Sequence, residues 1–269
     1  MDKPLKLMAI LAHPDDESLG FGGSLAKYAA QGVEISLIVA TRGERGWRGP
    51  TEEDPGLATV GAIREKEVRA AADVLGVETV RFLDLVDGEM DRANHPAIAA
   101  RIAAHIRDIR PQVVLTFDPR GAYGHPDHIA ISQFALSAVI LAADPSAASI
   151  DGEAFGVSKF YYRVWNRAEN EAYGEVFGVL ALDVDGEVRQ SAPWEEWSIT
   201  TRIDTREQWR TVWEAVRKHA SQVGEIEKLS EVSDLKKLEL FGCEGYYRAF
   251  SLVNGGRERE DDLFAGLRD

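Results

Sequence analysis

Short apolar runs alternate with helix-length stretches along the first half of the chain. Four of these runs are rich in β-branched and long aliphatic residues: Leu5–Ala12, Val33–Ala40, Thr79–Leu83 and Val113–Phe117. A strand that is apolar at nearly every position is typical of a parallel sheet with both faces covered. The pattern therefore predicts four buried, parallel strands.

Helical periodicity fills the stretches between these runs. Two sets of apolar residues each share one helix face: Val68, Ala71, Ala72 and Leu75, and Ile98, Ile102, Ile106 and Ile109. Gly32 and Gly76 follow helical stretches, where glycine readily adopts the positive φ of a helix C-terminus. Strands and helices in alternation predict a doubly wound α/β fold, with a mostly parallel sheet and helices on both faces.

The second half of the chain is less regular. Residues 144–156 mix Pro, Ser, Ala, Asp and Gly, as a linker or a surface connection does. Asp204 with Glu207 resembles a capping pair that opens a helix. Strand-like runs lie at Phe160–Trp165, Val179–Val184, Trp197–Ile203 and Tyr246–Val253. We expect a core at residues 1–150 that carries the chemistry. A C-terminal α+β extension at residues 151–269, with a soft boundary, is expected to complete the sheet and the substrate pocket.

Composition and charge narrow the classes of function. Among 269 residues, 45 are Asp or Glu and 31 are Lys or Arg, so the net charge of −14 argues against nucleic-acid binding. The single cysteine, Cys243, excludes an intramolecular disulfide and a Cys-rich zinc site. The chain has no uninterrupted run of about 18 apolar residues, and its first residues lack the apolar stretch of a signal peptide. We therefore expect a cytoplasmic protein that does not bind membranes.

Polar residues cluster directly after two of the predicted strands. His13-Pro14-Asp15-Asp16-Glu17 follows the first, and Tyr123-Gly124-His125-Pro126-Asp127-His128 follows the fourth. Ligands bind beyond the carboxyl ends of the strands in a doubly wound sheet. Two imidazoles and one carboxylate, with a position left for water, form a catalytic zinc set. The sequence thus predicts that His13, Asp16 and His128 bind a metal ion that activates water.

The remaining polar residues of these two loops fit the other needs of a hydrolase. Asp15, next to a predicted ligand, is the candidate base for the metal-bound water, and His125 is the candidate proton donor or oxyanion partner. Asp127 is expected to orient His125 or to stabilise its charge, and the Tyr123 hydroxyl to contact the oxyanion. The other histidines (His95, His105 and His219) are expected at the surface or in packing roles, and the tryptophans are expected in the core.

The two motifs together resemble those of the LmbE-like, or PIG-L, family of zinc-dependent de-N-acetylases. Ala12-His13-Pro14-Asp15-Asp16-Glu17 and Gly124-His125-Pro126-Asp127-His128 both match without departure. The resemblance implies a Rossmann-like fold, the same metal ligands and base, and Tyr123 as a residue that polarises the substrate carbonyl. It also implies that Arg64 and Asp87 bind the sugar. The implied substrate is a small N-acetylglucosamine-type conjugate and the implied metal is zinc, with iron(II) as the alternative.

Other functions remain open from the sequence. A zinc amidase or esterase could use the same residues on a non-sugar substrate, because the loops rather than the metal site specify the substrate. A noncatalytic sugar- or nucleotide-binding module is less favoured, since a binder needs no spare base beside its metal. A two-metal phosphohydrolase would need a second full set of ligands, which we do not find. The sequence leaves open which conjugate is the substrate and whether the chain forms a homo-oligomer.

Overall fold

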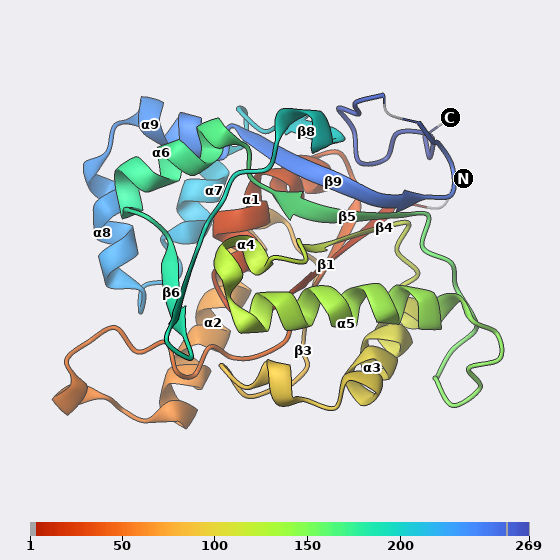
Figure 1. Ribbon diagram of the computed structural model, residues 1–269, viewed down its shortest axis with the longest axis horizontal. Coiled ribbons are helices and arrows are strands. Elements are labelled where there is room, and N and C mark those ends of the chain that lie inside the picture. Colours follow the sequence, from red (N-terminus) through yellow and green to blue (C-terminus); the bar gives the residue numbers. More distant parts are fainter. Residues whose placement is uncertain (1–3, 257, 269) are drawn as a thin grey trace.

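A seven-stranded sheet forms the centre of the protein. The computed structural model describes residues 4–256 and 258–268 of the chain (Figure 1). The strand order is β3-β2-β1-β4-β5-β9-β8, with β1 to β5 parallel and both β9 and β8 antiparallel to their neighbours. The strands are β1 (Lys6–Leu11), β2 (Glu34–Val39), β3 (Thr79–Phe82), β4 (Val113–Phe117), β5 (Lys159–Val164), β8 (Thr201–Asp204) and β9 (Cys243–Ser251). The predicted mostly parallel α/β sheet is confirmed.

The four apolar runs of the first half become the four strands β1 to β4. Their bounds differ from the predicted ones by at most one residue at either end. Every residue of β1 after Lys6 and every residue of β4 is buried. Strands covered on both faces have no polar alternation, and this explains why the continuous apolar pattern located them well.

The order of the strands places helices on both faces of the sheet. The helices are α1 (Asp16–Ala30), α2 (Leu57–Leu75), α3 (His95–Ile109) and α5 (Pro126–Ala143). Right-handed crossovers from β1 through β3 put α1 and α2 on one face, and the return to β4 puts α3 and α5 on the other. In agreement, α1 packs on α2, and α3 lies beside α5 (Figure 1). The direction of winding reverses between β1 and β4, where such folds bind ligands.

Helix α5 combines length with an apolar composition. It is 18 residues long and apolar enough to meet the criteria for a membrane span, yet 56% of it is buried inside the fold. It packs against α3 and covers β4. These contacts are those of a core helix in an α/β protein.

Three strands from the second half join the same sheet. β5, β9 and β8 extend it beyond β4, while β6 (Ala181–Val184) and β7 (Glu187–Gln190) form a separate hairpin that packs against α4 (Gly121–Gly124). A second apolar cluster lies among α6 (Arg167–Phe177), α7 (Trp209–Val216), α8 (Val223–Glu231) and α9 (Asp234–Phe241).

Two local predictions in the second half were wrong. The run predicted as one strand over 197–203 divides into the 3₁₀ turn Glu196–Ser198 and strand β8. Asp204 does not cap a helix, because α7 begins only at Trp209 and the Asp204 carboxylate pairs with Arg206. The residues between Asp204 and Trp209 turn the chain from strand to helix, with Gln208 N–H donating to the Thr205 carbonyl at 2.9 Å.

Candidate metal centre

The two polar loops meet where the winding of the sheet reverses. β1 and β4 are parallel neighbours, so their carboxyl ends lie at the same edge. His13 and Asp16 follow β1, and His128 lies in the first turn of α5, which follows β4. All three side chains are buried. The fold thus brings together three metal-binding residue types from two distant parts of the sequence.

Their donor atoms are spaced as one small cation requires. His128 Nε2 lies 3.3 Å from His13 Nδ1 and 3.4 Å from Asp16 Oδ1, and His13 Nδ1 lies 3.8 Å from Asp16 Oδ2. Zinc ligands at about 2.0–2.2 Å in a tetrahedron are about 3.3–3.6 Å apart from one another. The three residues fit three corners of such a site.

The Asp16 carboxylate is preorganised for this role. Its Oδ2 accepts the backbone N–H groups of His13 at 2.8 Å and Ala12 at 3.1 Å, which leaves Oδ1 facing His128. Burial opposes the charged form, but His128, His13 and these hydrogen bonds hold the pKa of Asp16 far below its ordinary value. The carboxylate is therefore an anionic donor at neutral pH.

His13 is held from its other ring nitrogen by two carboxylates. His13 Nε2 lies 3.2 Å from Asp127 Oδ2 and 3.2 Å from Asp87 Oδ1. Histidines that bind metals commonly donate their second N–H to a carboxylate, which fixes the tautomer and the ring orientation. This contact leaves His13 Nδ1, which faces Asp16 and His128, as the nitrogen that can bind a metal ion.

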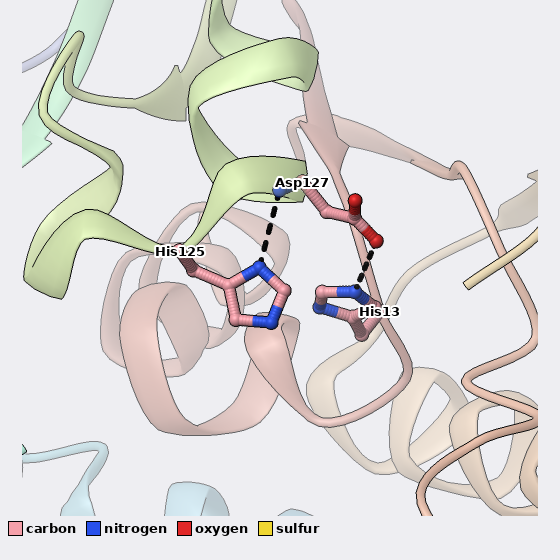
Figure 2. A group of neighbouring side chains, drawn as sticks. All are labelled: His13, His125 and Asp127. Atoms are coloured by element: carbon pink, nitrogen blue, oxygen red, sulfur yellow. Dashed lines mark hydrogen bonds and ion pairs between the residues drawn. The ribbon is translucent and has the colours of Figure 1, made fainter. Parts of the chain in front are cut away.

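Asp127 has contacts in the site through both its carboxylate and its backbone N–H. It contacts His13, and it also accepts the backbone N–H groups of Gly88 at 2.7 Å and Met90 at 3.2 Å. Its link to His125 is a backbone one, because the Asp127 N–H donates to His125 Nδ1 at 3.2 Å (Figure 2). This hydrogen bond fixes the His125 ring, and the Asp127 charge raises the pKa of His125, while the contact of the carboxylate with His13 lies outside the predicted role.

A second group of side chains also has metal-binding types close together. His13, His125 and Asp127 place one donor atom each within 4.8 Å of one another (Figure 2). In this group the Asp127 carboxylate already accepts two backbone N–H groups, and His125 Nδ1 accepts a third. In the first group Asp16 Oδ1 faces His128 and is left open by the backbone hydrogen bonds of Oδ2, so His13, Asp16 and His128 are the favoured candidate set.

The carboxylates around His13 favour the protonated form of its ring when no metal ion is bound. Burial lowers the pKa of His13, but hydrogen bonds to Asp127 and Asp87 and the charge of Asp16 outweigh burial and raise it to about 10. The metal-free protein therefore has His13 protonated at neutral pH. A metal ion can bind Nδ1 only after that proton has left.

Metal binding should consequently release a proton. At pH 7.5 we expect about one proton per zinc ion bound, and an apparent affinity that rises with pH until it levels off near pH 10. Calorimetric titration of the metal-free protein in two buffers of different ionisation enthalpy measures the number released. An enthalpy that is the same in both buffers would contradict a protonated His13.

Asp15 occupies an unusual backbone conformation next to the metal residues. Its φ of 105° is in the left-handed region, which non-glycine residues rarely adopt. The Asp15 N–H donates to Glu17 Oε2 at 3.0 Å, and Asp15 Oδ2 accepts from Arg64 Nη2 at 2.8 Å. The side chain lines the same cavity as the metal residues. Asp15 thus shares the cavity with the candidate metal residues, and its role as a base stays a prediction.

Arg64 and Asp87 both contact the machinery of the site. Arg64 is 4% exposed and donates to the Gly43 carbonyl as well as to Asp15, while Asp87 contacts His13 and accepts the Arg45 N–H at 3.0 Å. Both side chains also line the cavity. Their contact with substrate stays a prediction, and the hydrogen bonds within the protein give each of them a positioning role.

His125 is a neutral hydrogen-bond donor toward the cavity. Burial, followed by the nearby His128 and His13 rings, lowers the pKa of His125 to about 4. Because Nδ1 accepts the Asp127 N–H, the neutral ring carries its hydrogen on Nε2. A neutral imidazole donates a hydrogen bond to a developing oxyanion but carries no extra proton for a leaving group. The oxyanion role is thus favoured over the acid role.

A tight turn places Tyr123 over this part of the site. Ala122 has a φ of 62°, and its N–H donates to Asp118 Oδ1 at 2.8 Å. The Tyr123 ring meets the rings of His125 and His128 edge-on, with centroids 5.8 and 5.5 Å apart. The turn between β4 and α5 therefore presents Tyr123 and His125 to the same space.

These side chains open into one cavity of about 360 Å³. The metal residues, Asp15, His125 and Tyr123 line it together with a polar group from two loops and an apolar wall. The polar group comprises Arg45, Arg48 and Gln222, and the wall comprises Leu19, Trp165, Tyr173, Phe177 and Leu180. The volume suits a sugar-sized ligand with part of its attached group.

The apolar wall was missed by the sequence reasoning. Tyr173 and Phe177 belong to α6, and Trp165 and Leu180 lie just outside its two ends. The sequence predicts that the tryptophans lie in the core. A signal existed, because Asn166 and Glu169 form a capping box at the start of α6. That pattern identifies the helix, but only the tertiary structure reveals that one of its faces lines the cavity.

Comparison with known proteins agrees with this architecture. The family model described as PIG-L, GlcNAc-PI de-N-acetylase, matches residues 8–139. A protein of Streptomyces scabiei named 1D-myo-inositol 2-acetamido-2-deoxy-alpha-D-glucopyranoside deacetylase is 35% identical over 300 residues, covering 97% of this chain and 90% of its own.

Two solved structures share the fold. N,N'-diacetylchitobiose deacetylase from Pyrococcus horikoshii superposes with a TM-score of 0.67 and 22% identity, over 90% of this chain and 83% of its own. The 4-carboxy-2-hydroxymuconate hydratase GalB from Pseudomonas putida KT2440 superposes with a TM-score of 0.70 and 23% identity, over 94% and 99%. Identities this low show the fold alone, and the two names show that the fold hosts more than one reaction.

Proposed function

Because the chain belongs to the PIG-L family of de-N-acetylases, we propose that it is a metal-dependent hydrolase that removes the acetyl group from an N-acetylglucosamine conjugate. The observation that supports this most is the set of three donor atoms, His13 Nδ1, Asp16 Oδ1 and His128 Nε2, beside Asp15 in one cavity. We propose zinc as the metal, since two imidazoles and a carboxylate suit it and no thiolate is needed.

The reaction adds water to an amide and yields acetate and a free amine. His13, Asp16 and His128 would hold a zinc ion, which would lower the pKa of the attacking water and polarise the acetamide carbonyl. Asp15 accepts a proton from the attacking water, as its carboxylate is held at the cavity by Arg64. His125 Nε2–H, with the Tyr123 hydroxyl, donates to the carbonyl oxygen as negative charge develops.

The amine needs a proton when the C–N bond breaks. Asp15 has just accepted one from the water, whereas His125 is neutral because its pKa is about 4. We therefore assign the return of that proton to Asp15, which passes it to the leaving nitrogen. Asp15 thus acts as base and then as acid, and the carboxylate ends the cycle in its starting state.

The substrate is proposed from the relatives and from the cavity. The Streptomyces scabiei relative is named for an inositol glycoside of N-acetylglucosamine. The hydroxyl-rich part of such a molecule suits Arg45, Arg48 and Gln222, and the apolar ring face suits Trp165 and Phe177. The substrate that we propose first is accordingly a small glycoside of N-acetylglucosamine.

An assay of acetate and free amine tests the proposal. The panel comprises 1D-myo-inositol 2-acetamido-2-deoxy-alpha-D-glucopyranoside, N,N'-diacetylchitobiose and free N-acetylglucosamine. We expect equimolar acetate and amine from at least one glycoside, loss of activity in a chelator and recovery with zinc.

The same assay separates the alternatives. A hydratase adds water to a double bond and releases no acetate, and an esterase or amidase of another kind would act only on non-sugar substrates. Zinc-loaded protein that releases no acetate from any N-acetylated sugar of the panel would overturn the proposal.

A further inference from the structure

A buried pair of side chains lies directly behind the proposed base. Glu17, in the first turn of α1, is 0% exposed, and His219, in the turn that follows α7, is 2% exposed. His219 Nε2 lies 2.7 Å from Glu17 Oε1. Burial disfavours the charged ring, but the Glu17 carboxylate outweighs it and raises the pKa of His219. The mechanism above uses neither residue.

Glu17 joins this pair to the backbone of Asp15. Its Oε2 accepts the Asp15 N–H at 3.0 Å, while Oε1 also accepts the Ser18 hydroxyl at 2.6 Å. Asp15 has the left-handed φ of 105°, and a non-glycine residue keeps such a conformation only when its surroundings impose it. The Glu17 carboxylate is one of those constraints, and Arg64 holds the other end of the same residue.

His219 is in turn what keeps Glu17 in place. A buried carboxylate is stable only when it has close polar partners, and His219 Nε2 is such a partner for Glu17 Oε1. Within the described part of the chain, His219 Nδ1 has no hydrogen-bond partner, so its polar contacts run through Nε2 to Glu17 and Ser18. The ring is placed to serve Glu17.

We infer that Glu17 and His219 are a positioning pair for the proposed base. His219 fixes the Glu17 carboxylate, and Glu17 fixes the Asp15 backbone so that the Asp15 carboxylate meets the attacking water. The inference rests on the proposed function, because it assigns Asp15 as the base. It also places a residue from the C-terminal half of the chain, outside the residues 8–139 that match the family, behind the chemistry.

The first test is His219→Gln, assayed on the best glycoside of the panel. We expect kcat to fall about 10- to 100-fold, the usual effect of losing an outer contact or of displacing a reacting group slightly. KM should change less than about twofold, and zinc content should stay at the wild-type value, because His219 contacts neither the cavity nor a metal residue. A purely structural role would lower the melting temperature without this separation of kcat from KM.

His95→Gln is the matched control. His95 is half-buried, its Nε2 lies 2.9 Å from Ser137 Oγ, and its ring packs edge-on against Phe134 at 4.9 Å. It makes contacts of similar kind on α3 and none with Asp15. We expect an unchanged kcat in this variant, whatever its melting temperature.

A second pair of variants keeps the inference testable if His219→Gln folds poorly. Glu17→Gln retains an oxygen that can accept the Asp15 N–H, and Glu17→Ala does not. We expect Glu17→Gln to keep a severalfold higher kcat than Glu17→Ala at equal zinc content. Adding His219→Gln to Glu17→Ala should lower kcat little further, because the two residues act as a unit.

Several outcomes would overturn the inference and leave the proposed function intact. They are a wild-type kcat in His219→Gln, equal kcat values in the two Glu17 variants, or a loss of kcat that is matched by a loss of zinc. Failure of the wild-type protein and of His95→Gln to release acetate would instead overturn the proposed function.

Discussion

Asp15→Asn should lower kcat by about 10²- to 10⁴-fold while the protein keeps its metal, the usual effect of removing a positioned acid or base. Asparagine has nearly the same shape and its side-chain oxygen can still accept from Arg64 Nη2, which lies 2.8 Å from Asp15 Oδ2. It cannot accept a proton from water at neutral pH. The variant therefore removes the proton transfer and leaves the metal residues untouched.

Zinc content and steady-state kinetics on the best glycoside measure this effect. Asp84→Asn is a matched control, because Asp84 also has a positive φ, of 51°, and its carboxylate also contacts an arginine, Arg42. The control should retain wild-type turnover. Turnover near wild type in Asp15→Asn with metal bound would show that Asp15 is not the base.

His128→Ala should abolish activity by removing the metal. The ring is proposed to supply one of three donor atoms, since its Nε2 faces both His13 Nδ1 and Asp16 Oδ1. Loss of an outer contact alone weakens metal affinity roughly 10- to 100-fold, so loss of a ligand should cost more than about 100-fold. Equilibrium dialysis against buffered zinc measures the affinity, and the acetate assay measures the activity.

His125→Ala tests whether His125 binds the metal ion or only lies beside the proposed metal ligand His128. The rings of His125 and His128 stack with centroids 4.7 Å apart, so the two substitutions disturb the same region. We expect His125→Ala to bind zinc as the wild type does and to lose about 10²- to 10³-fold in kcat, as when an oxyanion donor is removed. Equal loss of zinc in both variants would contradict the division of roles between them.

The strands and the meeting of the two loops could be predicted from sequence for one physical reason. Parallel strands buried on both faces are apolar throughout, so β1 and β4 stand out, and residues that follow such strands share one edge of the sheet. The convergence of the loops that carry His13, Asp16 and His128 follows from that rule. It required no knowledge of side-chain packing.

The contacts around the site could not be predicted in the same way. The Asp127 carboxylate contacts His13 across 114 positions of the sequence, and His219 contacts Glu17 across 202. Such pairs depend on which way a side chain leaves its helix and on loops that only the folded chain places. The apolar wall from α6 was hidden for the same reason, since an aromatic residue in a cavity and one in the core look alike in sequence.

The position of the bound ion tests the central claim most directly. Anomalous diffraction at the zinc edge from crystals of zinc-loaded protein locates it without reference to activity. We predict a single site about 2.0–2.2 Å from His13 Nδ1, an Asp16 carboxylate oxygen and His128 Nε2. An ion held instead between His13 Nε2, His125 and Asp127, or no ion in this cavity, would contradict the account.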